Sequence, residues 1–351
     1  MLYNHIGTKS GILIDTIIIN REREIMEQEF IGIDLGSNSL RGVRMCVSGD
    51  AKKGIKGLEY TALKTFDANV RTAEGLESSG EICNAAVARI VDNLLKMRET
   101  LEIVESDCVI ALTTQAMRKA RNREQVLQEI FRKSGIAFQV IDGAMEAKIT
   151  ALPPKIAMRS IGKSNYKFSS NCFLLIDMGG ASSEFIVCGK DSTGSEIEFA
   201  RSFEIGIVSA KDRYGNIAQL LAQSDEFLAP IVEFMKSCKK KGAIPKFVVA
   251  NSGTPTIVCA LKLGLQEYDP KAVFGKELTK QDFNEVLAIF SALDTESQIA
   301  RVGKYKADVV PYGIALFTCF IETLGFEECL VLDEGLREGA VLARVLGLLK
   351  A

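Results

Sequence analysis

One segment of the chain interrupts a strand-like apolar run with acids and glycines. Residues 173–187 read FLLIDMGGASSEFIV, and they contain Asp177, Gly179, Gly180 and Glu184. An unpaired carboxylate is costly to bury, so a core strand gains nothing from these acids. The segment is therefore either an ordinary hairpin with a solvated tip or a site for an anion and a metal ion.

A second segment repeats this pattern. Residues 30–45 read FIGIDLGSNSLRGVRM, and five positions match the first segment. The matches are Phe30 with Phe173, Ile33 with Ile176, Asp34 with Asp177, Gly36 with Gly179, and Ser39 with Ser182. Each copy predicts a strand, a glycine-containing turn and a second strand. The copies are too far apart for a solenoid, so they favour two similar α/β domains that face one another.

The two turns suit a phosphate chain. Small residues at 36–37 and 179–181 let backbone N–H groups approach a phosphate closely. Asp34 and Asp177, at strand ends, are suitable ligands for Mg²⁺, which prefers carboxylates, water and phosphate oxygens. A single acid–glycine turn would be interpreted as a capped hairpin. Two matched copies favour a phosphate and metal site instead.

Other segments have both a functional and a structural interpretation. TTQAMRKARN, residues 113–122, places Arg118 just after a strand, where it would bind phosphate or belong to a solvated basic helix face. From this stretch alone the solvated face is favoured. Glu146, in VIDGAMEAKI, would activate water if burial raised its pKa, or simply stabilise a helix start. ANSGT, residues 250–254, is either a phosphate loop or a turn, and LDEGLREG, residues 332–339, begins a final helix.

Composition excludes several classes of protein. The 351 residues are 25% charged and 47% hydrophobic, which is typical of a globular chain long enough for two domains. A net charge of −2 argues against coating nucleic acid, and no apolar stretch has the length of a membrane span. GILIDTIIIN, residues 11–20, is short and lacks a cleavage site, so residues 1–28 are predicted to be a dispensable extension with a natural start near Met26.

The cysteines and the histidine limit the chemistry. Nine cysteines are scattered without a CxxC pair, which predicts reduced, mostly buried thiols in a cytoplasmic protein and no structural zinc. His5 is the only histidine, so acid–base catalysis would rest on carboxylates. Between the two copies and after the second, helical and strand patterns alternate, which predicts mixed α/β architecture. Residues 155–171 are the most loop-like stretch and are expected to form an exposed connection.

Taken in order, these segments resemble the exopolyphosphatase / guanosine pentaphosphate phosphohydrolase family, in its short two-domain form. The resemblance runs from about residue 30 to about residue 348. Residues 33–43 resemble the first phosphate motif of the family, residues 176–187 its second, and residues 114–122 its T-x-A-x-R-x-A-x-N segment. IDGAMEAKI, ANSGT and LDEGLREG resemble its remaining motifs.

The resemblance implies two ribonuclease H-like domains of the actin, sugar kinase and heat-shock type, with the active site in the cleft. The implied ranges are 1–28 for the extension, 29–149 and 150–335 for the domains, and 336–351 for a helix that packs on the first domain. It also implies Mg²⁺-dependent hydrolysis of a terminal phosphoanhydride of polyphosphate or guanosine pentaphosphate, without nucleic acid or membrane partners, by a chain that forms a homodimer.

By motif position, the resemblance implies roles for individual residues. Glu146 would be the base, Glu184 a second acid, and Asp34, Asp177 and Glu184 metal ligands. The implied phosphate-binding residues are Gly36, Ser37, Asn38, Ser39, Arg41, Arg118, Gly179, Gly180, Ala181, Ser182, Ser252, Gly253 and Thr254.

Three positions depart from the family pattern. Ala181 stands where a third glycine is usual, Met145 replaces a glutamate, and Lys148 replaces an arginine. These departures put rate and substrate preference in question more than fold. They leave two alternatives to hydrolysis: an ATP-dependent kinase of the same superfamily, or a non-catalytic sensor of guanosine tetraphosphate or polyphosphate. Longer members continue into a helical domain, so a short member is expected to bind substrate with the two core domains.

Overall fold

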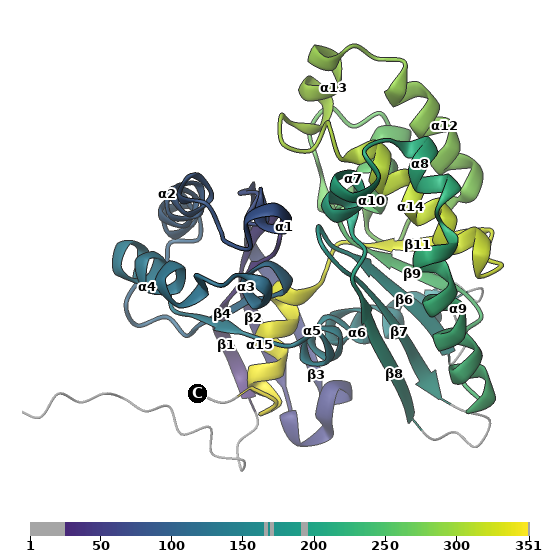
Figure 1. Cartoon of the computed structure of the whole chain (residues 1–351). Helices are drawn as coiled ribbons and strands as arrows, with labels where there is room; N and C mark the ends of the chain where they lie inside the picture. Colours follow the sequence, from purple (N-terminus) through teal and green to yellow (C-terminus); the bar gives the residue numbers. More distant parts are fainter. Residues whose placement is uncertain (1–24, 165–167, 169–171, 191–195, 350–351) are drawn as a thin grey trace, which may run out of the picture.

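The chain folds into two lobes, each built around one β-sheet (Figure 1). The computed structural model describes residues 25–164, 168, 172–190 and 196–349. The first lobe contains the five-stranded sheet and the second lobe contains the six-stranded sheet. No helix in these ranges is long and apolar enough to cross a membrane.

The first sheet has the strand order β3-β2-β1-β4-β5. The strands are β1 (Ile25–Leu35), β2 (Ser39–Gly49), β3 (Leu58–Asn69), β4 (Val109–Thr113) and β5 (Phe138–Val140). β1, β2 and β3 form an antiparallel meander, whereas β4 and β5 continue the sheet in parallel from β1. The predicted first hairpin is therefore β1 and β2, with its glycine turn between them.

The second sheet repeats this arrangement. Its order is β10-β11-β9-β6-β7-β8, formed by β6 (Cys172–Met178), β7 (Ser183–Lys190), β8 (Glu196–Phe203), β9 (Val248–Asn251), β10 (Glu277–Thr279) and β11 (Glu328–Leu332). β6, β7 and β8 are antiparallel neighbours, and β9 pairs in parallel with β6. The order β8-β7-β6-β9-β11 thus matches β3-β2-β1-β4-β5 of the first sheet, which confirms the predicted α/β fold with two similar domains.

Helices cover the outer face of each sheet. In the first lobe these are α1 (Leu76–Ser79), α2 (Asn84–Thr100), α3 (Gln115–Lys119) and α4 (Arg123–Ser134). In the second lobe they are α7 (Ile207–Tyr214), α8 (Ile217–Ala222), α9 (Asp225–Lys240), α10 (Gly253–Lys262), α11 (Pro270–Val273), α12 (Lys280–Ser291), α13 (Thr295–Val302) and α14 (Val310–Thr323). A 3₁₀ segment, η1 (Ala51–Gly57), joins β2 to β3 and contacts α6 (Leu152–Ser164). The apolar stripe of α2, with Ile90 and Leu94 fully buried, packs on the strands beneath it.

Three further helices lie between the sheets: α5 (Gly143–Thr150), α6 (Leu152–Ser164) and α15 (Leu336–Val345). Ile149 of α5 belongs to the core of the first sheet, and Ala147 of the same helix belongs to the core of the second. α15, yellow in Figure 1, leaves β11 of the second lobe and packs against β1, β2 and β4 of the first. A Cβ atom on Gly32 would lie 2.0 Å from the carbonyl oxygen of Arg337, so β1 needs glycine where α15 crosses it.

Two expectations about boundaries were wrong. β1 begins at Ile25, so the last four residues of the predicted extension belong to the first sheet. Residues 155–164 form most of α6 rather than an exposed connection, and Ala157 and Met158 are buried against the second sheet. Pro153 and Pro154 lie in the first turn of α6, where the missing N–H groups cost no helical hydrogen bond. Residues 1–24, with His5, lie outside the described residues.

The nine cysteines are all free thiols, as predicted. Cys172, Cys188, Cys238, Cys259 and Cys329 are buried, whereas Cys83 is exposed.

Candidate active site

The two glycine turns have the same internal hydrogen bond. The N–H of Gly36 donates to the carbonyl of Ser39, and the N–H of Gly179 donates to the carbonyl of Ser182, each over 2.9 Å. These two N–H groups therefore close the turns and are not free to bind phosphate. The expectation that both glycines donate hydrogen bonds to phosphate is therefore corrected, because the N–H of the first glycine of each turn is already bonded to a carbonyl within that turn.

The two turns also contact one another. A Cβ atom on Gly180 would lie 3.2 Å from the Cβ atoms of both Ser37 and Asn38. Gly180 is thus one of the points at which the two lobes contact each other, and it lies at the turn of the second hairpin. The first residues of α7 bind the second turn. The N–H of Ile207 donates to the carbonyl of Gly179 over 3.0 Å, and the N–H of Val208 donates to the carbonyl of Gly180 over 2.8 Å.

The equivalent strand pairs differ in charge. Asp34 lies opposite Arg41 in the first hairpin, and Asp177 lies opposite Glu184 in the second. Opposite charges across a strand pair are favourable, whereas like charges directly opposite are destabilising. The second hairpin therefore concentrates negative charge that a cation or a proton must offset.

Four carboxyl groups share this negative region. Burial raises the pKa of Asp34 to about 7, with a further contribution from Glu146. Burial, with the charges of Asp34 and Glu146, raises the pKa of Asp177 to about 8. Burial also raises the pKa of Glu184 well above its usual value, helped by Glu146 and Asp177, although Ser202 donates a hydrogen bond of 2.7 Å to Glu184.

The acids fit a divalent cation held by few protein ligands. Within the described residues, no group of three or more histidine, cysteine, aspartate and glutamate side chains is arranged to hold a metal ion by itself. However, Oδ1 of Asp34 is buried without a hydrogen-bond partner. Mg²⁺ commonly binds one or two carboxylates and takes its other ligands from water and phosphate. Asp34 and Asp177 fit that arrangement, and their role as ligands stays a prediction.

Glu146 is positioned by its helix and by one arginine. Asp142 caps α5 by accepting a hydrogen bond from the N–H of Met145 over 2.8 Å, which places Glu146 in the first turn. Nη1 of Arg118 donates to Oε2 of Glu146 and to the carbonyl of Ile141, both over 2.7 Å. Burial raises the pKa of Glu146, and Arg118 partly opposes that rise. The raised pKa is the property that a carboxylate base needs.

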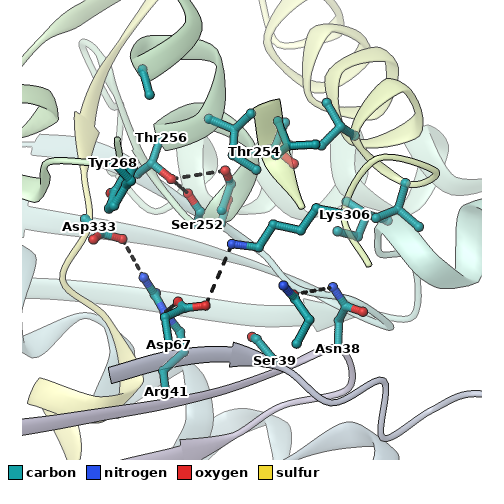
Figure 2. A pocket seen from close by; sticks show the side chains of 18 of the residues that line it. Asn38, Ser39, Arg41, Asp67, Ser252, Thr254, Thr256, Tyr268, Lys306 and Asp333 are labelled. Carbon is teal, nitrogen blue, oxygen red and sulfur yellow. Dashed lines mark hydrogen bonds and ion pairs between the residues drawn. The ribbon is translucent and has the colours of Figure 1, made fainter. Parts of the chain in front are cut away.

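A cavity of about 500 Å³ lies beside the turns, between the lobes (Figure 2). Nine of the predicted site residues line it: Asp34, Asn38, Ser39, Arg41, Gly179, Gly180, Ser252, Gly253 and Thr254. The other predicted site residues do not line it: Gly36, Ser37, Arg118, Glu146, Asp177, Ala181, Ser182 and Glu184. Asp34 thus belongs both to the cavity wall and to the group of interacting carboxylates.

Several polar atoms around the cavity are buried without partners. Oδ1 of Asn38 and Oγ of Ser252 belong to residues that line the cavity, and Oδ1 of Asn251 belongs to the residue just before Ser252. Buried polar atoms in folded proteins are nearly always hydrogen-bonded, so each unpaired one indicates a missing partner. The ANSGT loop supplies two of these atoms, which supports its interpretation as part of a binding site rather than a simple turn.

Arg41 is already paired with two acids. Its Nε donates to Asp67 over 2.8 Å and its Nη2 to Asp333 over 2.6 Å. Figure 2 also shows Lys306 extending from the second lobe toward Asp67, at 3.7 Å. Phosphate binding by Arg41 therefore stays a prediction, since a phosphate would have to share or displace these carboxylates.

Many residues of the cavity were not predicted as site residues, and Asp67, Tyr268, Lys306 and Asp333 are among them. Asp333 lies in the LDEGLREG segment and could have been singled out from it, because an acid at the end of a strand is the feature that identified Asp34 and Asp177. Asp67, Tyr268 and Lys306 have no comparable local signal.

The far wall of the cavity is largely apolar. It includes Ile257, Ala260, Leu261, Leu265, Val302, Val309 and Val310, and Tyr268 also lines the cavity. A polar end with unpaired groups and an apolar wall are the usual features of a site for an organic ligand.

Comparison with known proteins identifies this arrangement. The family model described as the Ppx/GppA phosphatase family matches residues 52–347. The chain belongs to this family. The matched range begins after the first glycine turn and contains the second turn, Glu146 and the ANSGT loop, and the roles of these residues stay predictions.

Individual relatives agree with this assignment. A guanosine-5'-triphosphate,3'-diphosphate pyrophosphatase of Aeromonas hydrophila is 25% identical over 322 residues, covering 89% of this chain and 58% of that protein. The exopolyphosphatase 1 of Mycobacterium tuberculosis is 24% identical, covering 89% of this chain and 87% of that protein. The crystal structure of an exopolyphosphatase from Cytophaga hutchinsonii covers 91% of this chain and 98% of its own, with 23% identity and a TM-score of 0.70. The chain thus spans about three fifths of the Aeromonas protein.

Proposed function

We propose that the protein is a phosphohydrolase that releases the terminal phosphate of guanosine pentaphosphate or inorganic polyphosphate. The observation that carries the proposal is Glu146, a buried carboxylate with a raised pKa, held by Arg118 next to the two glycine turns of a Ppx/GppA family member. Membership in the family supports the reaction class, and the geometry supports the assignment of the base.

In the proposed reaction, Glu146 takes a proton from a water molecule, which attacks the terminal phosphorus in line with the leaving oxygen. Glu184, oriented by Ser202, helps to hold that water. Arg118 and the N–H groups of the turns other than those of Gly36 and Gly179 stabilise the charge that develops on the phosphoryl oxygens. A phosphate chain running from the cavity past Gly180 would bring its end toward Glu146.

The carboxylates Asp34 and Asp177 would hold Mg²⁺. The bound ion would offset negative charge on the phosphates and on the acids themselves. This role agrees with the unpaired Oδ1 of Asp34 and with the raised pKa values of both groups.

The cavity favours a nucleotide over bare polyphosphate. Its apolar wall would accept a base and a ribose, whereas a polyanion would gain nothing from it. Two cations of the cavity, Arg41 and Lys306, are also paired with acids of the same cavity. We therefore expect guanosine pentaphosphate to be hydrolysed with a lower KM than short polyphosphate.

A phosphate-release assay tests these proposals. Guanosine pentaphosphate, long polyphosphate, short polyphosphate and ATP are compared with and without Mg²⁺. Glu146→Ala should lower kcat by about 10²- to 10⁴-fold and leave nucleotide binding intact. Glu129→Ala, which removes an exposed carboxylate paired on the surface of α4, serves as the control.

Three results would contradict the proposal. Unchanged turnover of Glu146→Ala would refute the base. Transfer of phosphate from ATP to a small acceptor, instead of to water, would favour a kinase. Tight binding of the nucleotide in the presence of Mg²⁺ without any phosphate release would favour a sensor.

A further inference from the structure

Two residues of α3 reach across the cleft to a single acid of the second lobe. Nε2 of Gln115 donates to Oε1 of Glu204 over 3.3 Å, and Nζ of Lys119 lies 3.2 Å from Oε2 of the same carboxylate. Gln115 and Lys119 are one helical turn apart, so they project from the same face of α3. Glu204 directly follows β8, one of the two edge strands of the second sheet.

Gln115 also contacts the arginine that holds the proposed base. Its Oε1 accepts a hydrogen bond of 2.7 Å from Nη2 of Arg118. Arg118 can only donate and the Glu204 carboxylate can only accept, so the orientation of the amide is determined by its two neighbours. A neutral amide is the group that satisfies both ends at once. A glutamate at position 115 would repel Glu204, and a lysine would repel Arg118.

We propose that Gln115, Lys119 and Glu204 form a clasp between the lobes, and that Gln115 transmits closure of the clasp to Arg118 and Glu146. The role of Gln115 as a positioning residue rests on the proposed hydrolysis; the clasp itself does not. In the family pattern T-x-A-x-R-x-A-x-N, residues 115 and 119 fall on unspecified positions. Gln115 and Lys119 are therefore not among the residues that define the motif.

Burial shows how the parts of the clasp differ. The Gln115 residue is only 7% exposed, whereas the side chain of Glu204 is 68% exposed. Closing the cleft gives the buried amide N–H its acceptor, and opening the cleft leaves that donor without one. With the cleft closed, Arg118 is held at three points, by Gln115, the carbonyl of Ile141 and Glu146. Closure of the cleft thus orients the guanidinium group of Arg118, which in turn orients the carboxylate of Glu146.

The first experiment separates closure from hydrolysis. Small-angle X-ray scattering of the ligand-free full chain reports the radius of gyration, which does not depend on any activity. We expect Glu204→Gln and Gln115→Met to increase it relative to wild type. Glu198→Gln, which breaks the ion pair between β8 and Lys155 but does not reach Arg118, should leave it unchanged. Equal radii for all four proteins would overturn the clasp.

Kinetics test the link to Glu146. Glu204→Gln weakens an exposed contact and should lower kcat by about two- to fivefold, with KM unchanged. Gln115→Met also removes an acceptor from Arg118 and should lower kcat by about tenfold or more. Equal kcat values for Gln115→Met and wild type would overturn the positioning role. If wild type releases no phosphate, the proposed function fails, and the scattering comparison still decides the clasp.

A charge exchange provides the sharpest test. Lys119→Glu combined with Glu204→Lys restores the ion pair, but it places a cation opposite the N–H donor of Gln115. We expect the radius of gyration to return toward the wild-type value while kcat stays low. Full recovery of kcat would show that the amide transmits nothing. Failure of the radius to recover would show that the ion pair does not hold the lobes together.

Discussion

Replacing Asp34 by asparagine should make the metal-free protein more stable at pH 8. In the folded chain burial raises the pKa of Asp34 from 3.8 to about 7. A carboxyl group with a raised pKa binds its proton more tightly in the folded than in the unfolded state, so its contribution is present at low pH and is lost as pH rises from about 4 through 7. Asparagine cannot ionise, so the Asp34→Asn variant avoids this loss.

The rise in the pKa of Asp34 sets the expected gain in the free energy of unfolding. About 3 pKa units at about 1.4 kcal/mol each amount to at most about 4 kcal/mol in the free energy of unfolding. Asp34 is partly accessible to solvent, so a smaller value of about 1–3 kcal/mol is expected. The charge of Asp34 also contributes to the raised pKa of Asp177, so the substitution should relieve both groups in the same direction.

Urea denaturation at pH 5, 6, 7 and 8 measures this effect, with EDTA in one series and Mg²⁺ in the other. In EDTA the wild type should lose stability relative to Asp34→Asn as pH rises. Mg²⁺ should restore the wild type at pH 8 and affect the variant less. Asp92→Asn, at an exposed position of α2, is the control and should follow the wild type. Parallel curves for Asp34→Asn and wild type in EDTA would refute the reasoning.

Two further substitutions test the turn contact and the core. Gly180→Ala should lower kcat severalfold, because the added methyl group would lie 3.2 Å from Ser37 and Asn38 and would push the two turns apart. Gly36→Ala should change kcat little, because its methyl group would meet no atom closer than 3.6 Å. Equal kcat values for these two variants in a phosphate-release assay would contradict this expectation. Phe185→Ala should lower the free energy of unfolding, measured by urea denaturation, by about 3–5 kcal/mol, because Phe185 is fully buried against the rings of Phe203 and Phe320. A loss below about 1 kcal/mol would show that neighbouring side chains fill the space left by the ring.

Features with a local cause were predictable. The acid, the glycine turn and the flanking strands are adjacent in sequence, so the two hairpins and their similarity could be inferred from residues 30–45 and 173–187. Glu146 was found for the same reason, since a strand, a capping aspartate and a helix start precede it within a few residues. The error at residues 155–164 also has a local cause, because two prolines before that stretch resemble a break when they only begin a helix.

Features that depend on contact between distant segments were not predictable. Arg41 was expected to bind phosphate, but it is paired with Asp333, which is 292 positions away in the sequence. Gln115 has an ordinary place in a helix, and only the approach of Glu204 gives it a second hydrogen-bond partner. The sequence around Arg41 or Gln115 does not indicate which distant side chain each will contact in the folded chain.

By itself the sequence determined the two-domain α/β plan, the paired glycine turns and the presence of carboxylates at the ends of their strands. These follow from chain stiffness, side-chain periodicity and the conformational freedom of glycine, which act over a few residues. The tertiary structure decided which distant side chains meet: Arg41 with Asp333, Arg118 with Glu146, and Gln115 with Glu204. Burial and like-charge proximity arise only when the sheets and lobes come together, so the raised pKa values and the clasp exist only in the folded chain.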